Sequence, residues 1–129
     1  MAAYLTTFNA AKVNAQAAQG TPDHINVLLF YQKGCCGSCA EVESYVKDTL
    51  NQYYSDDMKS GKISYQVADP KKDKSLADKY NVKDWALKLV ITRNGKESVV
   101  DVPEIWMYVG NRDASMSTLK NAINKQMGK

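Results

Sequence analysis

The chain has 129 residues, 44% of them hydrophobic and 24% charged, which is typical of one globular domain with its own core. A formal net charge of +3 gives no indication of nucleic-acid binding, and no motif that reads DNA or RNA is present. No apolar run approaches the ~18 residues of a membrane span, and residues 1–8 lack the pattern of a signal peptide. We therefore expect a cytoplasmic protein, a monomer with neither a membrane nor a nucleic acid as partner.

The first half of the chain predicts two helices and two strands. An alanine- and glutamine-rich helix is expected over residues 4–19, and an unbroken apolar run over residues 25–31 indicates a central strand covered on both faces. From Ser38 to about Tyr54 the apolar residues recur every three or four positions, which predicts a long helix that residues 55–57 and 60–61 interrupt. Alternation over residues 63–68 predicts the next strand.

The second half predicts a short helix over residues 73–80 and a strand over residues 87–92, followed by the Asn94-Gly95 hairpin signal. Residues 98–102 and 105–109, on either side of Pro103, indicate one interrupted strand or two short ones. A last helix is predicted by apolar residues at helical spacing, namely Met116, Leu119, Ile123 and Met127.

This order of elements predicts an α/β fold. Two parallel strands joined by a helical crossover, then an antiparallel hairpin and a covering helix, give a mixed central β-sheet flanked by helices on both faces. We expect a single domain over residues 1–129, with an N-terminal helix in residues 1–20 and a core over residues 25–129.

All three cysteines lie within five residues, between the central strand and the long helix, as Cys35, Cys36 and Cys39. A helix N-terminus stabilises a thiolate, and the i, i+3 spacing of Cys36 and Cys39 brings the two thiols to one face of the helix. In a cytoplasmic chain such a pair is more often redox-active or metal-binding than a structural disulfide. Redox exchange, metal capture with His24 as a conceivable fourth ligand, and inert thiols all remain open.

From about residue 20 onward the chain resembles the thioredoxin superfamily. The matching residues are the strand over 27–31 leading into Cys36-Gly37-Ser38-Cys39, then Ala68-Asp69-Pro70, residues 76–82, the strand over 87–92 with Asn94-Gly95, and the last helix. The resemblance implies a thioredoxin-like fold and a thiol–disulfide oxidoreductase without a cofactor or metal, with Cys36 as the attacking thiol and Cys39 as the resolving thiol. It implies a disulfide-containing protein substrate, an external reductant, and substrate contacts at Gly37, Ser38, Trp85 and Ala86.

Three departures from the family pattern define the alternative. Where relatives have a cis-proline, this chain has Trp85-Ala86, whose peptide bond we expect to be trans. Phe30 stands where relatives bury an acid, and Cys35 replaces a tryptophan. Cys35 is expected to be an incidental buried thiol or a regulatory thiol that pairs with a neighbour. The alternative function is a non-catalytic protein of the same fold that binds a metal, an iron–sulfur cluster or a partner protein through the three cysteines.

Overall fold

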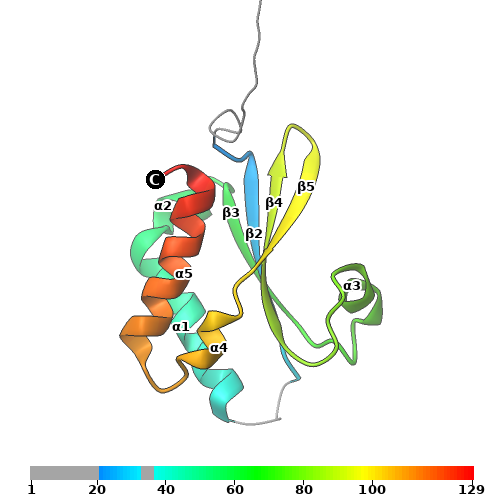
Figure 1. Ribbon diagram of the computed structural model, residues 1–129. Coiled ribbons are helices and arrows are strands. Elements are labelled where there is room, and N and C mark those ends of the chain that lie inside the picture. Colours follow the sequence, from blue (N-terminus) through cyan, green and yellow to red (C-terminus); the bar gives the residue numbers. More distant parts are fainter. Residues whose placement is uncertain (1–20, 33–36) are drawn as a thin grey trace, which may run out of the picture.

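The computed structural model describes residues 21–32 and 37–129 and contains a four-stranded mixed sheet in the order β3-β2-β4-β5 (Figure 1). The strands are β2 (His24–Phe30), β3 (Ile63–Ala68), β4 (Ala86–Arg93) and β5 (Lys96–Asp101). β2 runs parallel to β3 and antiparallel to β4, so that Phe30 lies between Ala68 and Ala86. The helix predicted over residues 4–19 lies outside the described residues.

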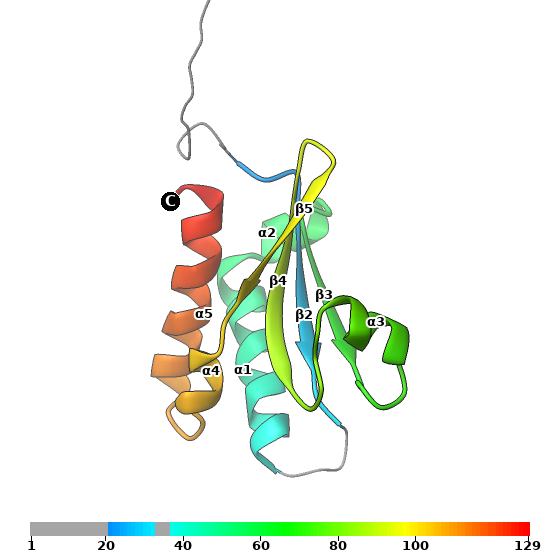
Figure 2. The same cartoon turned by 45° about the vertical axis from the view of Figure 1, so that its right-hand side comes forward.

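The helices cover both faces of this sheet, as the sequence predicted. α1 (Gly37–Tyr53), α2 (Ser55–Lys59), α4 (Glu104–Met107) and α5 (Arg112–Met127) lie on one side, and α3 (Lys74–Lys79) lies on the other (Figures 1 and 2). Side-chain caps fix two of the helix starts: Asp73 accepts a hydrogen bond from the Leu76 amide, and Asn111 accepts one from the Ala114 amide, each at 3.2 Å. Among the described residues, no helix is long and apolar enough to cross a membrane.

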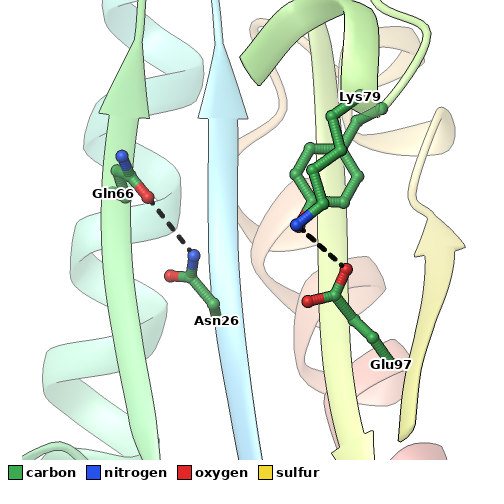
Figure 3. Close-up of polar contacts among 5 residues, drawn as sticks. Asn26, Gln66, Lys79 and Glu97 are labelled. Carbon is green, nitrogen blue, oxygen red and sulfur yellow. Dashed lines mark hydrogen bonds and ion pairs between the residues drawn. The ribbon is translucent and has the colours of Figure 1, made fainter. Parts of the chain in front are cut away.

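β2 is buried on both faces, which explains its unbroken apolar run. Ile25, Val27 and Leu29 belong to the larger core cluster with α1 and α5, whereas Leu28 and Phe30 belong to a second cluster beneath α3. Toward the start of β2, the surface on the α3 side is polar: Asn26 donates to Gln66 of β3 at 3.3 Å (Figure 3).

α3 is also tied to the edge of the sheet. An ion pair of 3.6 Å joins Lys79 of α3 to Glu97 of β5 (Figure 3). The Tyr80 hydroxyl, one residue beyond α3, donates to the same carboxylate at 3.1 Å.

Two predictions of local structure were wrong. Residues 105–109 do not form a strand, because β5 ends at Asp101 and the one-turn helix α4 follows Pro103, whose φ of −68° suits a helix start. Only the Ile105 side of α4 is fully buried, and Met107 is 75% exposed. Residues 55–57, expected only to end the long helix, begin α2 instead, with Asp56 and Asp57 in its first turn, where the helix dipole favours acidic groups.

The hairpin and the last helix are as predicted. Asn94 and Gly95, with φ values of 54° and 79°, form the turn between β4 and β5, whose positive φ angles favour this residue pair. Met116, Leu119, Ile123 and Met127 are the buried apolar residues of α5.

Candidate functional site at the start of helix α1

The first turn of α1 lies at the end of the sheet where β2 finishes. α1 begins at Gly37, the residue that directly follows Cys36 in the sequence. The Ser38 side chain is exposed, while Cys39 is only 5% exposed and belongs to the same core cluster as Tyr31, which follows β2. The first-turn amides of a helix have no partners within it and carry a partial positive charge. Cys39 is therefore buried in the first turn of α1, where these amides and this partial charge lie.

The remaining two cysteines lie outside the described residues. The predicted roles of Cys36 as the attacking thiol and Cys35 as a regulatory thiol therefore stay predictions.

A partly buried polar cluster, formed by Tyr31, Glu43 and Tyr65, lies on the same side of the sheet as Cys39. The Tyr31 hydroxyl donates to Glu43 Oε1 at 2.6 Å. The Tyr65 hydroxyl, from β3, is buried and has no hydrogen-bond partner among the described residues. Burial, and then the neighbouring Glu43 and Tyr31, raise the pKa of Tyr65 above its ordinary value. Glu43 thus lies near two tyrosine hydroxyls, of which only that of Tyr31 donates to it.

The sequence analysis did not predict this cluster and assigned no role to Tyr65 or Glu43. The available signal was the spacing of Glu43, four residues after Cys39, which puts both side chains on one face of a helix. The part played by Tyr65 depends on the pairing of β3 with β2, and that pairing appears only in the fold.

A groove of about 530 Å³ lies beside the same end of the sheet, lined by residues 81–88, Asp101, Pro103 and Trp106. Trp85 is 58% exposed, and its ring centroid lies 6.2 Å from that of Trp106. Ala86 is opposite Phe30 in the sheet, so this segment is next to the strand that leads toward the cysteines. The Trp85–Ala86 peptide bond is trans, as expected. The fold thus brings Trp85 and Ala86 to the end of the sheet that holds Cys39.

His24 lies at the opposite end of β2. Its Nδ1 is 2.9 Å from the Gly61 carbonyl oxygen and its Nε2 is 2.9 Å from Ser64 Oγ. The seven residues of β2 span about 20 Å at ~3.3 Å per residue. His24 is therefore too far from Cys39 to share a metal ion with it, and the idea of a fourth ligand at this residue is wrong. Within the described part of the chain, no group of three His, Cys, Asp or Glu side chains could hold a metal ion.

No family model and no curated protein matches the sequence. Among solved structures, the chain is similar to a thioredoxin from Fasciola hepatica, with a TM-score of 0.51, 17% identity, and coverage of 81% of this chain and 83% of that chain. It is also similar to Deadhead, a germline-specific thioredoxin from Drosophila melanogaster, with a TM-score of 0.50, 25% identity, and coverage of 80% of this chain and 81% of that one.

Proposed function

This chain adopts a thioredoxin-like fold, as its motifs predicted, and on that premise we propose that it is a thiol–disulfide oxidoreductase acting on protein disulfides through Cys36 and Cys39. The observation that supports this most directly is the start of α1 at Gly37. Gly37, Ser38 and Cys39, three of the four residues of the motif, form the first turn of α1, and Cys39 is buried there.

In the proposed reaction, the Cys36 thiolate attacks one sulfur of the substrate disulfide. A bond forms between Cys36 and that sulfur, and the other substrate sulfur leaves as a thiolate. Cys39 then attacks the Cys36 sulfur, which forms the Cys36–Cys39 disulfide and releases the second substrate thiolate. The substrate gains two electrons, the protein loses two, and an external dithiol reductant restores the reduced protein.

The groove supplies the proposed contact for the substrate polypeptide. Trp85 offers an exposed indole ring that rests against Trp106, so a substrate side chain can pack on it with little ordering of the protein. Gly37 has no side chain and Ser38 a small one, so we expect these two residues to leave room for the substrate backbone. This reading assigns Trp85, Ala86, Gly37 and Ser38 to substrate binding.

The proposal is tested by the reduction of a protein disulfide such as those of insulin by the pre-reduced protein. We expect the parent to reduce it, Cys36→Ser to be inactive, and Cys39→Ser to accumulate a covalent complex with the substrate. Cys35→Ser is the matched control, since it removes a neighbouring thiol without touching the motif. A parent that is inactive, or as active as Cys36→Ser, would refute the proposal.

Mass mapping of the mildly oxidised protein provides an independent check. A Cys36–Cys39 disulfide supports exchange through the motif, whereas pairing of Cys35 supports its role as a regulatory thiol. Metal analysis of protein purified without oxygen separates the alternative function, because a stoichiometric metal held by the cysteines would favour a metal- or cluster-binding protein.

A further inference from the structure

Cys39 has a carboxylate on the next turn of its own helix. Glu43 follows it by four residues, a spacing that places two Cβ atoms about 5–6 Å apart on one face of a helix. Helical side chains also lean toward the N-terminus, so the Glu43 side chain lies over the turn that contains Cys39. The most direct route for a proton leaving the buried thiol therefore leads toward Glu43.

Tyr31 holds this carboxylate on the inner side of the helix. Its hydroxyl donates to Glu43 Oε1 at 2.6 Å, and Tyr31 itself is 6% exposed within the core cluster that also contains Cys39. A short hydrogen bond to an ionised acceptor is about twice as strong as one between neutral groups. Tyr31 thereby ties Glu43 to the end of β2, although 22% of the Glu43 side-chain surface still reaches solvent.

The charged and titratable groups around Glu43 come from three elements. Lys47 on α1 has its Nζ 3.8 Å from Glu43 Oε2, Tyr31 follows β2, and Tyr65 comes from β3. The Lys47 ammonium and the Tyr31 hydroxyl thus contact the two oxygens of this carboxylate, one each. Because 22% of the Glu43 side-chain surface reaches solvent, the carboxylate can return a proton to water.

From this arrangement we infer that Glu43 is the proton acceptor for Cys39 in the resolving step, and that Tyr31 is the residue that positions it. The inference rests on the proposed exchange through Cys36 and Cys39. The Cys39 S–H bond breaks and its proton passes to Glu43, while the freed electron pair forms the Cys36–Cys39 bond. The bond from Cys36 to the substrate sulfur breaks, the substrate leaves as a thiolate, and Glu43 releases its proton to water.

The test follows the reaction of the reduced protein with dithiobis(nitrobenzoate), whose thiolate product is coloured. All variants carry Cys35→Ser, so the first equivalent of colour reports attack by Cys36 and the second reports resolution by Cys39. We expect Glu43→Gln to leave the first phase unchanged and to slow the second about 100-fold at neutral pH, the low end of the contribution of a positioned base.

The pH profile separates this role from a merely structural one. If Glu43 takes the proton, the second phase of the parent should be nearly independent of pH from about pH 6 to about pH 8, below the ordinary thiol pKa. In Glu43→Gln the second phase should rise about tenfold per pH unit, since it then depends on the thiolate formed in water. Tyr31→Phe keeps every charge. It should slow the second phase less than Glu43→Gln does, and its pH dependence should lie between that of the parent and that of Glu43→Gln.

Glu41→Gln is the matched control. It removes the same charge from the same helix and disrupts a comparable contact, since the Tyr45 hydroxyl donates to Glu41 at 3.1 Å. Glu41 is two residues from Cys39 and therefore faces the other side of the helix, and its second phase should match that of the parent.

The outcomes distinguish the two proposals. A second phase in Glu43→Gln with the parent's rate and profile would overturn the inference alone. A parent that releases only one equivalent would overturn the exchange mechanism and the inference with it. If Glu43→Gln is unfolded by circular dichroism, Tyr31→Phe decides, because an unchanged second phase there also overturns the inference.

Discussion

The Tyr65 hydroxyl makes an unusual expectation possible, namely that deleting a buried polar group stabilises the protein. This hydroxyl is buried and has no hydrogen-bond partner among the described residues. An unpaired hydroxyl in a protein interior costs roughly 1–3 kcal/mol. Tyr65→Phe removes it and keeps the ring, so we expect the free energy of unfolding to increase by about 1 kcal/mol, and the melting temperature to rise by about 4 °C.

The same substitution at Tyr31 should have the opposite sign. Tyr31 donates to Glu43, and Tyr31→Phe leaves a partly buried carboxylate without its donor. Hydrogen bonds to charged groups contribute about 1.5–3 kcal/mol, so we expect a loss of this order. The two variants delete one atom each from the same cluster, which makes each the control for the other.

The assay is urea unfolding followed by far-ultraviolet circular dichroism at neutral pH and again above pH 10. Because burial raises the pKa of Tyr65 in the folded protein above its ordinary value of 10.0, the unfolded chain loses this proton first as the pH rises. The parent should therefore lose stability above pH 10 through this group, and the advantage of Tyr65→Phe should grow there. A Tyr65→Phe variant less stable than the parent at neutral pH would refute the reasoning.

Three further outcomes are expected. The Tyr54 hydroxyl donates to Asn124 at 2.6 Å, and burial raises the pKa of Tyr54 to about 12, so Tyr54→Phe should lower the free energy of unfolding by about 1–2 kcal/mol in urea at neutral pH. As the pH rises from 10 toward 12, the parent should lose stability through this group and Tyr54→Phe should not, so an identical alkaline loss in both would contradict this. Phe30→Ala should lower the free energy of unfolding by about 3–5 kcal/mol in the same assay, and Phe30→Asp by at least as much, because a carboxylate would enter an apolar cluster. A stable Phe30→Asp would contradict the described packing. Because Trp85 is exposed, Trp85→Ala should change the free energy of unfolding by less than about 1 kcal/mol. It should slow the reduction of insulin severalfold and leave the reaction with dithiobis(nitrobenzoate) unchanged, so equal effects on both substrates would argue against substrate contact.

Elements with a strong and regular pattern were predictable from the sequence. The apolar run that became β2 is buried on both faces because helices cover each side of the sheet. The periodic stretch that became α1 differs from its prediction by a single residue at each end. In both cases the residues that set the pattern are also the residues that pack in the core, so local and tertiary preferences agree.

α4 shows where such reasoning fails. In residues 105–109 the aromatic residues Trp106 and Tyr108 alternate with aliphatic ones. β-Branched and aromatic residues are typical of a strand. A strand also needs a neighbour to pair with, and the ladder between β4 and β5 ends at Lys88 and Asp101. Beyond that point the Val102 amide donates to Leu87 at 3.0 Å, and the chain then turns into a helix that buries Ile105. Propensity alone contains no information about where a partner strand stops.

The candidate site divides in the same way. The motif and its place at a helix start follow from local sequence, and the approach of Trp85 and Ala86 follows from the expected strand order. Glu43 could be found by its spacing from Cys39, but its link to Tyr31 depends on how α1 packs on β2, and Tyr65 depends on the register of β3. Contacts between residues of different elements cannot be predicted from the sequence pattern of any one element.

The origin of the carboxylate has a mechanistic consequence. Phe30, at the position where the family resemblance places an acid, points to the α3 side of the sheet, whereas Cys39 and Tyr31 belong to the cluster on the α1 side. A carboxylate at residue 30 would therefore extend from β2 on the side of the sheet opposite Cys39. Glu43 is carried by the helix that holds Cys39, so one helical turn sets their separation and Tyr31 sets the direction of the carboxylate. The proposed base, Glu43, would therefore move together with Cys39 if the first turn of α1 shifted against the sheet during the proposed exchange, whereas a base on β2 would not.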